Sequence, residues 1–181
     1  MNTRHAVIGL ASLVLGVSGS WAAMGVANVQ GTAPGSTISG TVKFEDTAGG
    51  LKVSAQLTGV PAGPHAFHIH EFGSCDDMGK AAGSHYNPLK SPHGEVLKVG
   101  IHHAHAGDLG NITAGADGTA ALEAVIPGVT LSGGKYDVAG RAVILHEKVD
   151  DFSQPAGNAG GRIGCGPIVL VGAPAPAAPA K

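Results

Sequence analysis

The sequence predicts a single all-β domain of eight short strands with two long loops. Several short segments alternate apolar and polar residues at period two, which is typical of half-buried strands. The 181 residues include 30 glycines and 11 prolines, enough for many tight turns. No long segment shows the period of an amphipathic helix. Together these observations favour a β-sandwich or barrel around one core.

The strands follow one another closely along the chain. Alternate residues of 37–44 and of 51–57 are apolar, and residues 46–50 between them predict a hairpin connection with a double glycine. Residues 65–72 form the third strand. The other predicted strands are 118–126, 142–146 and 167–171, with weaker patterns at 25–30 and 108–114.

Two stretches, 73–107 and 147–166, lack a strand pattern. Loops of this length in a compact domain usually carry function or move, so we expect both to be functional. The Ala/Pro-rich tail 172–181 is predicted to be disordered.

Residues 1–22 are predicted to be an export signal that is removed from the mature chain. Arg4 gives a positive start, residues 6–17 are apolar, and Ser20-Trp21-Ala22 is a small-x-small cleavage site; Gly25-Val26-Ala27 is a later candidate. A buried N-terminal helix and a retained membrane anchor are the alternatives. No other stretch is long and apolar enough to span a bilayer, so the mature domain, residues 24–171, is expected to have no membrane span.

The charge balance argues against a nucleic-acid partner. The chain has 11 lysines and arginines against 13 aspartates and glutamates, a formal net charge of −2. A nucleic-acid-binding domain would show a clustered basic excess.

Cys75 and Cys165 are the two cysteines of the chain. An exported protein meets an oxidising compartment, so one long-range disulfide is the natural interpretation. By loop entropy, such a crosslink would stabilise the fold by about 4–5 kcal/mol. Two unpaired buried thiols are the alternative.

Ten histidines are many for this length, and most lie between positions 68 and 146. In a strand, residues i and i+2 point to the same face, so His68 and His70 project side by side while Ile69 points into a core. Two such imidazoles can chelate a transition metal without rearrangement. The motif alone is weak, because an isolated His-x-His more often lies on an exposed strand face.

Other side chains strengthen the hypothesis of a metal site. His85, His93 and His105 lie in the first long loop, Asp108 follows soon after, and His146 ends a separate strand. Three or four imidazoles suit copper or zinc, and a histidine-rich set with one carboxylate suits tetrahedral zinc. For each histidine taken singly, a solvated surface residue is the alternative.

Arg162 stands close before Cys165, so a disulfide would hold it near the histidine-rich loop. An arginine there would be placed to guide a small anion towards a metal. From spacing alone, an ordinary surface arginine is the alternative.

Five blocks of this chain resemble the copper–zinc superoxide dismutases, in the family's order and over about residues 24–171. Cys75, which follows His70 closely, resembles the exported bacterial branch more than the cytosolic eukaryotic one. The blocks are HAFHIHEFG from His65, GSHYNP from Gly83, HAGDLGN from His105, GRAVILHEKVDD from Gly140 and GNAGGRIGCG from Gly157.

The resemblance implies a Greek-key arrangement of the eight strands. It also implies two metal sites that share His85 as a bridging ligand. Their implied ligands are His68, His70, His85 and His146 for copper, and His85, His93, His105 and Asp108 for zinc.

Further roles come from the same resemblance. Asp150 matches the carboxylate that links the two metal sites. Cys75 and Cys165 match the disulfide that holds the metal loop to the last strand, and Arg162 matches the arginine that guides the anion.

The implied activity is superoxide dismutation. Such an oxidoreductase converts two superoxide anions and two protons into dioxygen and hydrogen peroxide by alternating reduction and oxidation of copper. His85 and Arg162 are the implied catalytic side chains: His85 takes up and supplies a proton, and Arg162 offsets the substrate's charge. The implied location is the periplasm. A homodimer is compatible with the family, although no apolar patch in the sequence selects an interface.

The chain departs from the family pattern in three places. His102 and His103 have no family role and lie close enough in sequence to compete for zinc. Gly94-Glu95 follows His93 where relatives often have a Gly-Pro-like pair, and the gap to His105 is longer than usual. The loop between Asp150 and Arg162 is short, so charged residues that aid steering in relatives are expected to be missing.

Two other functions remain as alternatives. A copper-delivery protein on the same fold would be expected to have lost a copper histidine or the arginine. An exported structural domain stabilised by zinc alone would leave His68 and His70 unexplained.

Overall fold

This computed structural model describes residues 22–172. Within them, each segment whose apolar residues alternate at period two contains a β-strand. The strands are β1 (Met24–Gly31), β2 (Ser39–Thr47), β3 (Gly50–Thr58), β4 (Gly63–His70), β5 (Asp108–Ala114), β6 (Ala120–Ile126), β7 (Ala142–His146), β8 (Arg162–Pro167) and β9 (Val169–Val171).

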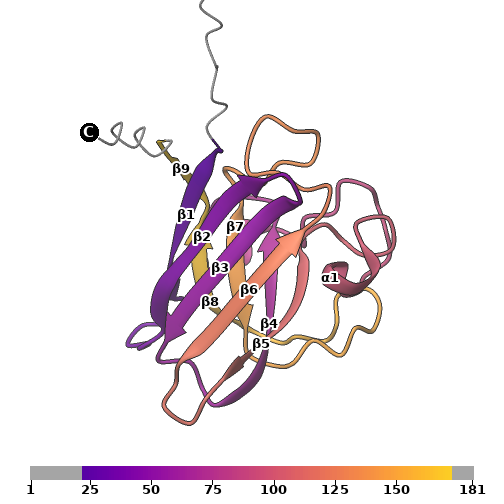
Figure 1. Ribbon diagram of the computed structural model, residues 1–181. Helices are drawn as coiled ribbons and strands as arrows, with labels where there is room; N and C mark the ends of the chain where they lie inside the picture. Colours follow the sequence, from indigo (N-terminus) through magenta and orange to yellow (C-terminus); the bar gives the residue numbers. More distant parts are fainter. Residues whose placement is uncertain (1–21, 173–181) are drawn as a thin grey trace, which may run out of the picture.

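Antiparallel pairing closes these strands into a barrel (Figure 1). β1 pairs with β2 on one side and with β8 on the other, and the order around the barrel is β2-β3-β6-β5-β4-β7-β8-β1. β9 follows β8 and pairs with the start of β1. The connections from β3 to β4 and from β6 to β7 join strands that are not neighbours, as in a Greek key. The predicted all-β, eight-stranded fold is confirmed, with β9 as an extra strand.

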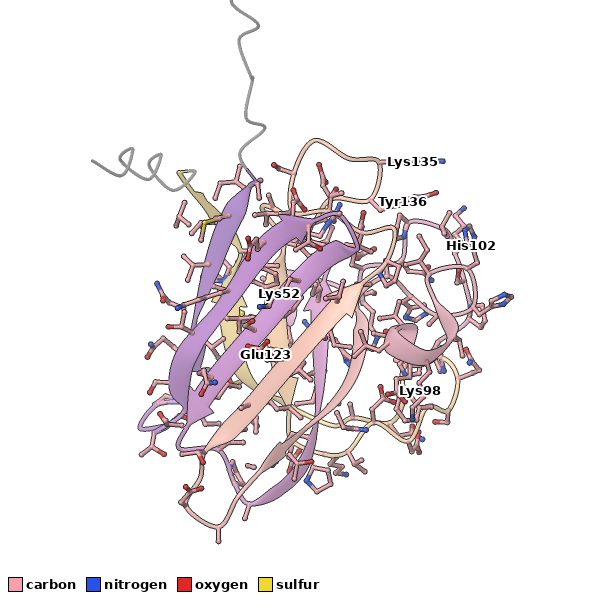
Figure 2. All side chains as sticks on the ribbon, viewed as in Figure 1. Lys52, Lys98, His102, Glu123, Lys135 and Tyr136 are labelled. Atoms are coloured by element: carbon pink, nitrogen blue, oxygen red, sulfur yellow. A yellow bond between two sulfur atoms is a disulfide. The ribbon has the colours of Figure 1, made fainter. Side chains whose placement is uncertain are left out.

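Alternate side chains of the strands point into the barrel and form its core. In β3 the side chains of Leu51, Val53, Ala55 and Leu57 are buried, as the sequence predicts. The outer face is polar. On it, Lys52 of β3 approaches Glu123 of β6 to 3.7 Å (Figure 2).

The sequence prediction was wrong about where the last strands begin. It placed loop as far as residue 166, whereas β8 begins at Arg162 and pairs with both β7 and β1. The glycines of β8 resemble those of a turn in the sequence, but in the structure they allow the strand to pack closely on its neighbours. A Cβ on Gly164 would lie 3.2 Å from side-chain atoms of Leu145 and Val29, so a larger residue would crowd the core.

Both long loops lie on the same side of the barrel, at the right in Figure 1. The first contains a 3-10 turn, Lys80–Ala82, and a single helical turn, α1 (Val96–Val99). A disulfide between Cys75 and Cys165 ties this loop to β8, with 5.7 Å between the two Cα atoms. The predicted disulfide is therefore confirmed, and the alternative of two free thiols is wrong.

The predicted export signal, 1–22, and the predicted tail, 172–181, lie outside the described residues except for Ala22 and Gly172. Within residues 22–172, no helix has the length and apolar character needed to cross a membrane.

Candidate metal centre

Strand β4 carries the two histidines of the His-x-His motif. The side chains of His68 and His70 are buried, and Ile69 between them points into the core as predicted. The alternative of an exposed strand face is therefore wrong for this motif. Neighbouring strands hold both positions, because His68 pairs with Ile144 and His70 with Ala142 of β7.

Two more histidines complete a first cluster around His68 and His70. His146 ends β7, and its Nε2 lies 3.3 Å from Nε2 of His70. His85 comes from the first long loop, which an isolated bridge to His70 holds beside β4. One ring nitrogen from each of the four lies within 4.8 Å of the others. The predicted copper ligands therefore converge.

A second cluster forms around Asp108, the first residue of β5. Its Oδ1 lies 2.8 Å from Nδ1 of His85 and 3.1 Å from Nδ1 of His105. Its Oδ2 lies 2.8 Å from Nδ1 of His93. Their ligand atoms again lie within 4.8 Å of one another. The predicted zinc ligands converge as well, and His85 belongs to both clusters.

The longer gap between His93 and His105 does not displace either residue from the cluster. Between the two histidines the chain forms α1 and the turn after it. That turn exposes His102 and His103 to solvent, and Figure 2 shows His102 on the outer side of the loop. Neither belongs to the converging groups found among the described residues.

Asp150 joins the two clusters from the second long loop. Its Oδ2 accepts a hydrogen bond from Nε2 of His68 at 2.8 Å, and its Oδ1 accepts one from Nε2 of His93 at 2.9 Å. The Asn111 side chain holds the Asp150 backbone through two hydrogen bonds, of 2.7 and 3.0 Å. Since both rings donate from Nε2, their Nδ1 atoms are left as acceptors that point into the clusters.

Those inward-facing nitrogens indicate that the site suits metal ions. The Nδ1 atoms of His68 and His93 are buried without a hydrogen-bond partner among the described residues. The 2.8 Å approach of His93 Nδ1 to Asp108 lacks hydrogen-bond geometry. Buried polar atoms normally have partners, and a shared cation would give these nitrogens one. Four imidazoles suit copper, and three imidazoles with one carboxylate suit zinc.

Burial sets the protonation of three rings of the first cluster. It lowers the pKa of His68 to about 4, that of His70 to about 2 and that of His146 to about 3. At neutral pH these rings are therefore uncharged, which is the state that binds a metal.

Carboxylates set the electrostatics of the second cluster. Burial would raise the pKa of Asp108, but hydrogen bonds with His105 and His85 and the close contact with His93 outweigh burial and hold this pKa well below its usual range. Burial would lower the pKa of His93, but its contacts with Asp108 and Asp150 raise it to about 9. Carboxylates that favour a proton on His93 would also favour a divalent cation.

A cleft leads to the first cluster. His70, His85 and His146 line it together with Arg162 and the exposed Lys90. Arg162 therefore lies beside the first cluster, half-buried in the wall of the cleft.

Backbone carbonyls of the disulfide-tied loop hold Arg162 in place. Its guanidinium donates to the carbonyl oxygens of Gly79 and Gly83, both at 2.6 Å. The Gly83 oxygen also accepts from Nδ1 of His70 at 3.0 Å, so one carbonyl positions both side chains. Because the acceptors are carbonyls rather than carboxylates, the guanidinium presents an uncompensated positive charge.

Sequence reasoning missed several supporting residues. His65 is buried, with its ring nitrogens 2.9 Å from the carbonyl oxygen of His146 and 2.8 Å from that of Pro61. It braces the end of β7, as Asn111 braces Asp150. The contacts of His65 with His146 and of Asn111 with Asp150 join segments that are remote in sequence, and no local pattern signals them.

Comparisons with known proteins agree with this geometry. The family described as copper/zinc superoxide dismutase (SODC) matches residues 38–168. Copper–zinc superoxide dismutase 2 of Mesembryanthemum crystallinum is 39% identical over 141 residues, which cover 74% of this chain and 88% of that protein. An extracellular copper–zinc superoxide dismutase of Caenorhabditis elegans is 40% identical over 139 residues, covering 73% of this chain and 61% of that protein. The crystal structure of the clock protein EA4 superposes with a TM-score of 0.73 at 34% identity, covering 84% of this chain and 97% of that one.

Asp150→Asn is expected to weaken zinc binding about 10- to 100-fold. An amide offers one acceptor oxygen, so the Nε2–H of either His68 or His93 would face an N–H donor. Competition between the purified protein and a zinc chelator measures the affinity. Asp151→Asn is the matched control, because this exposed carboxylate bonds only to Ser153 and Asn158 of its own loop. Unchanged zinc affinity in Asp150→Asn would contradict the linking role.

Proposed function

Since this chain belongs to the copper/zinc superoxide dismutase family, we infer that it is an oxidoreductase that dismutates superoxide with copper and zinc as its cofactors. The observation that carries this conclusion is the four-histidine cluster, which opens to a cleft beside Arg162 and shares His85 with a second, carboxylate-containing cluster. The overall reaction converts two superoxide anions and two protons into dioxygen and hydrogen peroxide.

We propose the following ligands. His68, His70, His85 and His146 hold copper, and His85, His93, His105 and Asp108 hold zinc. Copper supplies the one-electron oxidation and reduction that zinc cannot. The family assignment and the unpartnered inward-facing nitrogens support this assignment.

His85 is proposed as the side chain that moves a proton. Its Nδ1 faces Asp108 in the zinc cluster, and Asp108 fixes the orientation of the ring. The opposite nitrogen, Nε2, is the one left for the copper side, and it would carry a proton for the reduced oxygen species only while it is not bound to copper. A ring that belongs to both clusters is suited to this task, because the zinc-side contacts keep it in place.

Arg162 is proposed to guide and hold the anion. Its guanidinium lines the cleft beside His70 and His146, and it is fixed there by carbonyl acceptors. Lys90 adds a second positive charge to the same cleft. Glu71 also lines the cleft, so these three side chains leave it with a net positive charge, which raises the local concentration of a small anion.

The finer assignment to the exported, periplasmic bacterial type is also a proposal. The order of charge, apolar run and small residues in 1–22 supports a cleaved signal, with the mature domain over 24–171 and a tail over 172–181. The Cys75–Cys165 disulfide supports an oxidising compartment, and one relative is an extracellular enzyme.

A homodimer is our proposal for the assembly. The support is apolar surface that a soluble monomer would leave in water. Val169 and Leu170 of β9 are 51% and 56% exposed, and Phe72 and Met78 at the start of the first long loop are 59% and 52% exposed.

Purified mature protein is expected to contain about one copper and one zinc per chain and to remove superoxide. His146→Ala should lose copper and activity while it keeps zinc, because His146 belongs only to the copper cluster. Metal analysis beside a superoxide-consumption assay tests both. Full copper occupancy without activity would overturn the enzyme function and favour copper delivery.

Arg162→Ala is expected to keep both metals and to react about tenfold more slowly at low ionic strength, because a fixed positive charge beside the copper cluster is lost. Added salt screens that charge in the wild type, so the two rates should converge as ionic strength rises. Rates measured over a salt series check this. Equal salt dependence in both proteins would count against a guiding role.

Mass spectrometry of the chain secreted from cells should show that residues 1–22 are absent, and light scattering should give the mass of a dimer. A full-length mass would contradict the cleaved signal. A monomeric mass at micromolar concentration would contradict the homodimer.

A further inference from the structure

His93 stands on the least regular backbone of the zinc cluster. It follows Pro92, precedes Gly94, and lies outside every strand and helix of the described residues. Its backbone N–H and carbonyl make no bond to other backbone groups there. A ligand on such a segment needs another means of being fixed, because a sheet ladder does not hold it.

One side chain satisfies both backbone groups. The N–H of His93 donates to Oε1 of Gln154 at 3.0 Å, and Nε2 of Gln154 donates to the carbonyl oxygen of His93 at 2.9 Å. The two residues are 61 positions apart and belong to different long loops. A carboxamide is suited to this contact, since it offers a donor and an acceptor from one planar group.

Alternate residues of the second loop hold other parts of the same histidine. Asp150 accepts from the His93 ring at Nε2, and the ring of Phe152 stacks on it at 23° with centroids 6.3 Å apart. Gly157 closes the loop tightly behind this contact, because a Cβ there would lie 2.7 Å from Nε2 of His93. Ring edge, ring face and backbone of His93 are therefore all held by one short segment.

We propose that Gln154 is a positioning residue of the zinc site: its amide fixes the backbone of His93 so that Nδ1 stays directed at the cluster around Asp108. The proposal rests on the proposed role of His93 as a zinc ligand. It gives the short second loop a task of its own, which is to keep a ligand of the first loop in place. Gln154 is not one of the converging ligand residues and does not line the cleft, so it acts through His93.

Replacement of Gln154 is expected to speed zinc release about tenfold, the lower end of the effect of removing a contact that orients a ligand. Gln154→Met keeps the length of the side chain but loses both hydrogen bonds. Gln154→Glu keeps the acceptor for the N–H of His93 but places an oxygen against its carbonyl. The matched control is Gln56→Met, at an exposed position of β3 far from the site in sequence.

The experiment uses fully copper- and zinc-loaded protein and measures the rate of zinc transfer to an excess of chelator. Two further readouts are the visible spectrum with cobalt in the zinc site and the unfolding midpoint of the metal-free protein. Faster release and an altered cobalt spectrum, with a metal-free midpoint equal to that of Gln56→Met, would support positioning. Release within twofold of wild type would overturn it. A lower unfolding midpoint of the metal-free protein with an unchanged cobalt spectrum would overturn it too, because the contacts of Gln154 would then stabilise only the fold.

Zinc retention is measured whether or not the protein removes superoxide. Wild-type protein that holds zinc but lacks activity would overturn the proposed function and leave the positioning role of Gln154 standing. Wild-type protein that does not retain zinc would overturn both.

Discussion

The carboxylate of Asp150 is the contact on which both halves of the metal centre depend. It accepts hydrogen bonds from His68 on β4 and from His93 on the first long loop, so one buried group sets the orientation of a ring in each cluster. Its pKa lies well below the usual carboxyl range. Burial acts to raise this pKa, but the bonds with His68 and His93 outweigh burial. The carboxylate therefore stays ionised and keeps both Nδ1 atoms available to metals.

The barrel supplies the rigidity that such a centre needs. His68, His70 and His146 belong to paired strands and cannot move independently of the core. Asp108 and Arg162 stand at the first positions of β5 and β8, and the remaining side chains come from loops that are tied to the barrel. The Cys75–Cys165 disulfide joins the first loop to β8, and the Gly83 carbonyl then holds Arg162 and His70 together.

The second long loop shows how a shortened segment can keep a structural task. Between Asp150 and Arg162 its one charged residue is Asp151, so this part has little to offer in attracting an anion. Its residues Asp150, Phe152 and Gln154 instead surround His93. The cations that line the cleft, Arg162 and Lys90, come from β8 and from the first loop. In the function proposed above, attraction of substrate and support of the zinc cluster are thus divided between different segments.

Local pattern in the sequence determined the strand faces and the chelating pair. Alternation placed Leu51 and Val53 in the core, and period two placed His68 and His70 on one face, because side-chain direction in a strand follows from backbone geometry alone. Resemblance to a family then supplied the remaining ligands. Tertiary structure alone decided that β8 begins at Arg162 and that Gln154 holds His93. A glycine that a strand needs for close packing cannot be told from a turn glycine in the sequence. A hydrogen bond between residues 61 positions apart produces no periodic pattern in the sequence.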